Sequence, residues 1–169
     1  TEGEIPRPLL DSTGITVETE LLSVEPTDAE RATIDALQTF AAGGPLDPGI
    51  EWADQVIIGA GPLEGRRLTP SDMADRSNWI VENIPFFRAS GEESFTTLTL
   101  VPDPSMIGGP HNHCASPPVP APMSLAGLRR VSIQPALDTI DSCLQWRTFD
   151  VFFNADNRIA GITVDWWEP

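Results

Sequence analysis

The sequence predicts an α+β fold: a mainly antiparallel sheet of about four to six strands, with two helices packed on one face. Three observations lead to this prediction. Several short segments have the composition or the apolar–polar alternation of strands, two capping patterns precede apolar residues at helical spacing, and the C-terminal part has the pattern of a β-hairpin. The 169 residues fit an extended N-terminal tether over 1–12 and a single α+β domain over 13–169.

The first third predicts one strand and one helix. Residues 15–21 alternate apolar and polar side chains, the period of a half-buried strand. The stretch 27–30, Thr-Asp-Ala-Glu, is a capping box, and apolar residues follow it at helical spacing up to Ala41. Gly43 and Gly44 end this predicted helix.

The middle of the chain predicts more strands, a second helix and a long loop. Residues 55–58 form a short apolar strand before a glycine turn, and 94–101 and 128–133 are also strand-like. Thr69 and Pro70 begin a helix that we expect to continue until just before Pro85. Seven prolines between Pro102 and Pro122 predict a stiff proline-rich loop without regular structure.

The C-terminal hairpin has a specified register. Residues 149–153 and 158–167 flank the turn residues Asp156 and Asn157, and Asn154 is expected to pair with Ile159. In this register the core face pairs Phe149 with Val164, Val151 with Ile162, and Phe153 with Ala160. A slip of one residue would mix the two faces and lose their burial.

The other face of the hairpin carries the candidate binding residues, which are Trp146, Asp150, Asp165 and Trp167. Aromatic side chains beside carboxylates are typical of a sugar-binding platform, and this face could equally dock a protein partner. In the alternative interpretation a helix covers the aromatic residues and both carboxylates lie at the solvent-exposed rim.

Both histidines lie in the proline-rich loop, as His111-Asn112-His113-Cys114. Two imidazoles and a thiolate could hold zinc or copper, but a further ligand is needed and the spacing shows none. We therefore interpret the histidines as structural loop residues, with a metal site at His111 and His113 as the alternative. No cofactor is expected.

The two cysteines, Cys114 and Cys143, are expected to form a disulfide. It would close a loop of about 30 residues, worth about 3.6 kcal/mol in the chain-entropy estimate. Disulfides persist outside the reducing cytosol, so the pair predicts an exported protein. The polar, proline-bearing start is also typical of a tether that follows a signal peptide or a lipid anchor.

Composition restricts the function classes. The net charge of −15 would repel nucleic acid and anionic lipid headgroups. All ten basic residues are arginines, so chemistry that needs a lysine, such as a Schiff base, is excluded. The absence of lysine, together with abundant alanine, glycine and proline, is typical of a high-GC bacterium.

From these observations we expect a non-enzymatic domain, secreted or lipid-anchored at the bacterial cell surface, that binds a protein partner or a ligand. Inhibitor or immunity-type binding of a basic partner is one form of this function. One alternative is a small carboxylate-dependent enzyme or carbohydrate-binding domain that acts on envelope glycans. The other is a metal-binding protein that uses the His-x-His-Cys loop.

Overall fold

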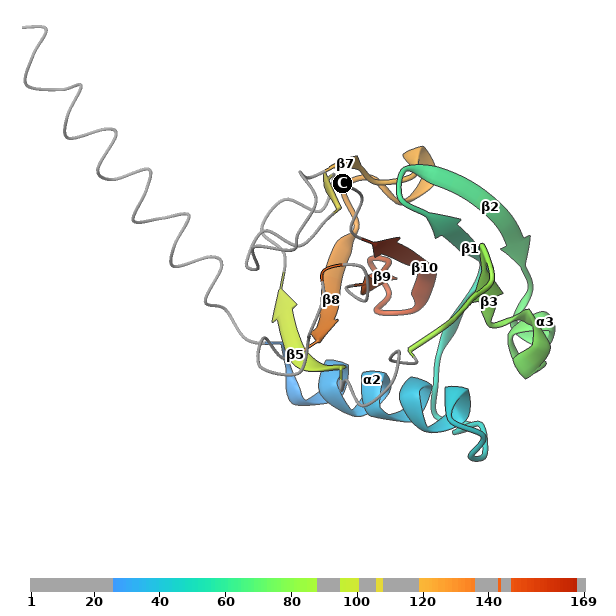
Figure 1. Cartoon of the computed structure of the whole chain (residues 1–169). Coiled ribbons are helices and arrows are strands. Elements are labelled where there is room, and N and C mark those ends of the chain that lie inside the picture. Colours follow the sequence, from blue (N-terminus) through green and yellow to red (C-terminus); the bar gives the residue numbers. More distant parts are fainter. Residues whose placement is uncertain are drawn as a thin grey trace, which may run out of the picture.

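The computed structural model describes residues 26–87, 95–100, 106–107, 119–135, 143 and 147–166. Its fold is α+β (Figure 1). The helical elements are α2 (Asp28–Ala41), α3 (Pro70–Met73) and the 3-10 turns η1 (Arg76–Asn78) and η2 (Met123–Leu125). The strands are β1 (Trp52–Ala60), β2 (Leu63–Leu68), β3 (Ile80–Val81), β4 (Ile84–Pro85), β5 (Phe95–Leu100), β6 (Met106–Ile107), β7 (Val119–Pro120), β8 (Arg129–Pro135), β9 (Arg147–Phe153) and β10 (Ile159–Trp166).

The main sheet is mixed, in the order β2-β1-β10-β9-β8-β5. Neighbouring strands are antiparallel except β1 and β10, which are parallel. In the view of Figure 1 the curved sheet has α2 beneath it, and η2 lies at the top on the opposite side. The sheet therefore presents one face to α2 and another face away from it.

Helix α2 begins and ends through identifiable hydrogen bonds. The Thr27 hydroxyl accepts from the Glu30 amide at 3.1 Å, and the Glu30 carboxylate accepts from the Thr27 amide at 2.8 Å, which is the predicted capping box. At the other end the helix has no basic residue in its last turn. Arg76 compensates from outside, because its guanidinium donates to the carbonyls of Phe40 and Gly44 at 2.6 Å each.

The main core lies between α2 and the sheet. Its helix side consists of Ile34, Leu37 and Phe40, and its sheet side includes Val131, Ile133, Phe149, Val151, Ile162 and Val164. Trp79, Phe86 and Phe87 fill the space between them. The Trp79 ring packs edge-on against Phe40 with their centroids 4.9 Å apart, and its indole N–H donates to the Met73 carbonyl.

The predicted C-terminal hairpin is confirmed, with one correction to its register. Phe149 pairs with Val164 and Val151 with Ile162, as expected. A bulge near Ala160 shifts the end of the ladder, so that Phe153 pairs with Ile159 and the expected partner Asn154 belongs to the turn. The Asn154 side chain accepts from the amides of Asp156 and Arg158 there, which accounts for its place outside the ladder.

The second predicted helix is much shorter than expected. It stops at Met73, and the chain continues as η1 and the β3–β4 hairpin. Asp75 accepts from the Ser77 amide, and Asn78 donates to the Asp72 carbonyl, so polar side chains take backbone bonds that a helix would use. Among the described residues, α2 is thus the one helix longer than a single turn.

Two further expectations can be compared with the described residues. The proline-rich stretch is not wholly irregular, because β6 pairs with β7 in a short antiparallel ladder and η2 follows it. The strand expected over 15–21, the tether over 1–12 and both histidines lie outside the described residues. No helix in the described part of the chain is long and apolar enough to cross a membrane.

Candidate functional site

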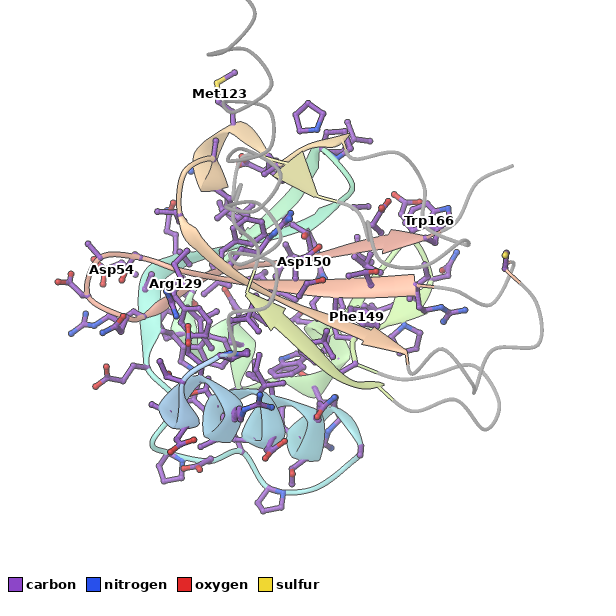
Figure 2. The ribbon with its side chains drawn as sticks, turned by 90° about the vertical axis from the view of Figure 1, so that its left-hand side faces the viewer. Asp54, Met123, Arg129, Phe149, Asp150 and Trp166 are labelled. Atoms are coloured by element: carbon purple, nitrogen blue, oxygen red, sulfur yellow. The ribbon has the colours of Figure 1, made fainter. Side chains whose placement is uncertain are left out.

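The face of the sheet that points away from α2 carries a row of polar side chains, here called the polar face. Its members come from three neighbouring strands: Arg130 and Ser132 on β8, Thr148 and Asp150 on β9, and Thr163 and Asp165 on β10. Asp150 lies directly opposite Ser132 on one side and Thr163 on the other. Figure 2 shows Asp150 on this side of the sheet and Phe149 on the α2 side.

Asp150 and Arg130 form a buried ion pair on the polar face. Their Oδ1 and Nε atoms are 3.8 Å apart, and the side chains are 1% and 2% exposed. Burial raises the pKa of Asp150, while the Arg130 charge and a hydrogen bond from Ser132 act in the opposite direction. An ion pair so deeply buried is weak evidence for stability, because desolvation offsets most of its attraction.

Several atoms of the polar face are buried without a hydrogen bond. Thr148 Oγ1, Thr163 Oγ1 and Asp150 Oδ2 are the clearest cases among the described residues. An unsatisfied buried group of this kind typically costs about 1–3 kcal/mol. Unsatisfied buried groups of this kind are few in folded proteins.

One end of the polar face is closed by an apolar cluster of Ile57, Ala121, Leu125 and Phe152. Gly161 makes this packing possible, because a Cβ there would lie only 2.5 Å from Leu125 Cδ1. Pro122 packs similarly near Gly59. The η2 segment therefore sits directly on the glycines of β1 and β10.

A second candidate site is an open hollow of about 400 Å³ beside the start of α2, here called the α2 cleft. It is lined by Thr27, Ala29, Glu30, Thr33, Arg129, Phe153 and Asn157. The α2 cleft lies on the helix side of the sheet, across the sheet from the polar face. Its volume falls within the range of small-ligand pockets, roughly 300–1,000 Å³.

The charged groups of the α2 cleft bind each other. Arg129 donates from Nε to Glu30 Oε2 at 2.6 Å and from Nη2 to Glu30 Oε1 at 2.9 Å. The bonds from Arg129 hold the pKa of Glu30 below its usual value despite partial burial, and the same bonds raise the pKa of Arg129. The Arg129 side chain is still 41% exposed, and its Nη1 makes no hydrogen bond to the described residues.

The structure brings together part of the sequence-predicted site. Asp150 and Asp165 share one face of the hairpin as predicted. The interpretation that placed both at a solvent-exposed rim is wrong for Asp150, which is buried, whereas Asp165 is half-buried. Trp146 and Trp167 lie outside the described residues, so the aromatic part of that hypothesis stays a prediction.

Most of the residues predicted to form a metal site or a disulfide also lie outside the described residues. His111, His113 and Cys114 all fall there. Cys143 is described, is half-buried and is not a free thiol, but its expected pairing with Cys114 stays a prediction. No group of three or more His, Cys, Asp or Glu side chains in the described part of the chain could hold a metal ion.

The arginines of β8 are the functional candidates that sequence reasoning missed. Arg129 and Arg130 are adjacent, so the period of a strand directs them to opposite faces of the sheet. The alternation of Arg130 and Ser132 with Val131 and Ile133 was a usable signal for a polar second face. Their partners Glu30 and Asp150 are distant in sequence, and no local pattern indicates them.

Comparisons with protein-family models, with curated proteins and with solved structures find no match.

Proposed function

We propose that this chain is a non-enzymatic binding domain of the bacterial cell envelope, secreted or lipid-anchored, that takes a protein partner or a small ligand in the α2 cleft. The observation that supports this proposal most strongly is an open hollow of ligand size whose charged groups are already paired. Such a surface can recognise a partner without supplying a reactive group.

The groups that line the α2 cleft favour binding over catalysis. Glu30 remains a carboxylate because its pKa is lowered, and both of its oxygens accept hydrogen bonds. A general acid needs a raised pKa and a transferable proton, so Glu30 is poorly suited to that role. The Thr33 hydroxyl donates to the Ala29 carbonyl, so its proton is also engaged.

The same groups indicate the chemistry of the partner. Ala29 and Phe153 offer apolar contact, while Arg129 Nη1 and the Asn157 side chain offer hydrogen bonds at the rim. The chain as a whole carries a charge of −15, which favours a neutral or basic partner over an acidic one. An inhibitor or immunity-type complex with a basic protein agrees with both features.

Binding in the α2 cleft can be tested by filling it. Ala29→Trp places a large side chain in the hollow, and Ala32→Trp places the same side chain on an exposed position of α2 outside it. We would titrate the isotopically labelled chain with a library of small neutral fragments and follow its amide resonances. Fragments should shift Ala29, Thr33 and Asn157 together, and Ala29→Trp alone should abolish these shifts. Shifts scattered over the surface, or unchanged in Ala29→Trp, would argue against the cleft.

The envelope location has a separate test. The codons that precede Thr1 in the gene should encode a signal peptide, with a lipid-attached cysteine if the domain is anchored. In intact producing cells the domain should then be degraded by added protease while a cytosolic control protein survives. Full protection in intact cells, followed by digestion after lysis, would place the chain inside the cell and contradict the proposal.

A further inference from the structure

Strand β2 forms one edge of the main sheet, and among the described residues β1 is its one strand partner (Figure 1). An edge strand presents backbone N–H and C=O groups that can pair with a further strand. Most of the side chains of β2 are exposed. The described part of the chain therefore leaves this edge accessible to another strand.

The large apolar side chains that are exposed in the described residues gather around β2: Leu63, Ile80 and Met123. Leu63 belongs to the strand itself and is 68% exposed. Arg66 of β2 donates to the Ile80 carbonyl at 2.6 Å. Met123 directly precedes Ser124, whose hydroxyl bonds side chains of β2. Exposed apolar residues that group together, rather than scatter singly, indicate an interaction surface.

A bulge in β2 gives its two leucines the same face. Leu63 lies opposite Ala60, and Leu68 lies opposite Val56. Ala60 and Val56 both belong to the main core on the α2 side, and residues directly opposite each other in a ladder share a face. Positions 63 and 68 would lie on opposite faces of a regular strand, but the extra residue Gly65 restores a common face.

The charged residues Glu64 and Arg67 share the other side of the strand, where η2 lies. Arg67 donates to the Ser124 hydroxyl at 3.1 Å, and that hydroxyl donates to Glu64 at 2.9 Å. Arg67 Nε also donates to Glu64 Oε1 at 2.5 Å. Each β2 strand thus presents two leucines on one side and an acid with a base on the other.

This pattern is self-complementary when a second copy of β2 pairs with it in an antiparallel ladder. In the register that places Leu63 opposite Leu68 of the second copy, Glu64 lies opposite Arg67 of that copy. A two-fold axis perpendicular to the sheet keeps both faces on the same side in the two copies. Leucine therefore meets leucine on one side, and carboxylate meets guanidinium on the other. Gly65, near the axis, has no side chain that could clash.

We propose that this chain forms a two-fold symmetric dimer in which the β2 strands of two copies pair antiparallel and join the two main sheets. The net charge of −15 repels two copies from each other, so their association needs complementary charges at the contact, and Glu64 and Arg67 supply them. A contact of two short strands is small, so the dimer forms in a concentration-dependent way. No residue of β2 lines the α2 cleft, and the dimer does not depend on the function proposed for that cleft.

Charge reversal in the whole chain tests this pairing. Glu64→Arg would place two arginines opposite each other in a dimer of that variant, and Arg67→Glu would place two glutamates there. In an equimolar mixture of the two variants the proposed register brings opposite charges together again. The matched controls are Asp35→Arg on α2 and Arg158→Glu in the β9–β10 turn, which change the net charge equally at exposed positions.

Sedimentation velocity over a range of concentrations would measure the average mass, and the amide resonances of residues 63–68 would be followed over the same range. Wild type should move from the mass of one chain toward that of two, and these resonances should shift in step. Each charge reversal should weaken association by about tenfold, because two symmetry-related attractions become repulsions. The mixture and both controls should associate as wild type does. Melting temperatures should change little, since the ion pair within each chain is exposed.

Three results would overturn the proposal. A wild-type chain that keeps the mass of one chain at the highest concentration would leave the β2 edge to a strand of another protein. Association that is unchanged in both charge reversals would place the interface elsewhere. A mixture that associates no better than the separate variants would exclude the proposed register. Because Ala29→Trp does not alter β2, loss of the dimer and loss of fragment binding in the α2 cleft are separate outcomes.

Discussion

Two adjacent arginines of β8 illustrate how single residues connect the two faces of the sheet to the rest of the molecule. Arg129 holds the first turn of α2 through Glu30, and Arg130 balances the buried charge of Asp150. Neither arginine could exchange roles with the other, because strand geometry fixes the face to which each side chain points. The helix side thus gains a partly exposed ion pair, and the other side gains a fully buried one.

The Glu30–Arg129 pair predicts an acid-dependent loss of stability. Because the folded-state pKa of Glu30 lies below its ordinary 4.5, its contribution is complete above pH 4.5 and is lost as the pH falls through the lowered pKa. Glu30→Gln should reduce the free energy of unfolding by about 1–3 kcal/mol at neutral pH. The difference between wild type and Glu30→Gln should shrink on acidification.

Urea unfolding at several pH values measures this difference directly. Asp150 has the opposite sign, since burial raises its pKa and its ionisation destabilises the fold as the pH rises above 3.8, but it is common to both proteins and cancels. The control is Glu64→Gln, which alters the exposed pair with Arg67 and should change stability little. A wild-type advantage that stays constant down to low pH would contradict the role assigned to Glu30.

Gly161 predicts a second residue-scale effect. A Cβ at this position would lie 2.5 and 2.6 Å from the two terminal carbons of Leu125, whose buried side chain cannot move into solvent. Gly161→Ala should therefore lower the free energy of unfolding by about 1–3 kcal/mol. Gly49→Ala should cost little, since its nearest neighbour is the exposed Asp47 carboxylate.

Denaturant unfolding of a double mutant separates this clash from a backbone effect. In a Leu125→Ala background the obstacle is gone, so adding Gly161→Ala should cost much less than it does in wild type. If the two losses simply added, the steric contact between Leu125 and position 161 would not be the cause.

At the scale of elements, the sequence predicts those helices and strands that are specified by residues close together in the chain. The capping box of α2 and the core face of the hairpin follow from neighbouring residues. The capping box is confirmed, and so are the core-face pairs of Phe149 with Val164 and Val151 with Ile162, whereas the predicted pair of Phe153 with Ala160 is wrong. The parallel pairing of β1 with β10 joins segments about a hundred residues apart, and no periodicity indicates it. The second predicted helix is wrong in length because the side chains of Asp75 and Asn78 form hydrogen bonds with the nearby backbone. These bonds compete with the hydrogen bonds of a helix, and a pattern of apolar residues does not reveal that competition.

The candidate sites also combine features that a local pattern predicts with contacts between distant segments that no local pattern predicts. Alternation along the hairpin placed Asp150 and Asp165 on one face, but it could not show that Asp150 meets Arg130 in the interior. The α2 cleft requires three elements to meet, namely α2, β8 and the β9–β10 turn. Sites assembled from distant segments are visible only once the fold is known.

Burial on both faces of the hairpin changes what charged substitutions should do. The hairpin pattern alone would make Val151→Asp severe and Thr163→Asp mild, as for a sheet with one face in water. Both positions are fully buried, and Thr163 lies directly opposite Asp150, so a new aspartate there would place two carboxylates together. We expect both variants to be unfolded, as shown by the loss of dispersed amide resonances. A folded Thr163→Asp would show that the polar face is open to solvent.

For the whole molecule, charge and cysteine content bear on where the chain works. The excess of acid is not confined to the described residues, since residues 1–25 alone contain six acidic residues and one arginine. Asp28, Asp35, Asp47 and Asp54 are exposed in the structure and add to this negative surface. This negative charge is a reason to propose a basic protein as the partner, because it would repel nucleic acid.

The metal alternative can be tested on the untagged whole chain. If His111 and His113 are structural, purified protein should contain no stoichiometric zinc or copper, and the double substitution to alanine should leave the fold unchanged. Elemental analysis that finds one metal ion per chain, absent from the double variant, would establish the histidines as ligands.

The predicted disulfide bears both on the stability of the fold and on the cellular location of the chain. Cys143 is not a free thiol, and Cys114 is the other cysteine of the chain. A bridge between them would constrain the unfolded chain, so Cys114→Ser and Cys143→Ser should each lower the free energy of unfolding by about 2–4 kcal/mol. The two losses should not add in the double variant, because either substitution alone removes the bridge. Mass spectrometry of protein alkylated without reduction measures the pairing itself, and two alkylated cysteines in protein taken from its natural compartment would contradict both the bridge and the export that it supports.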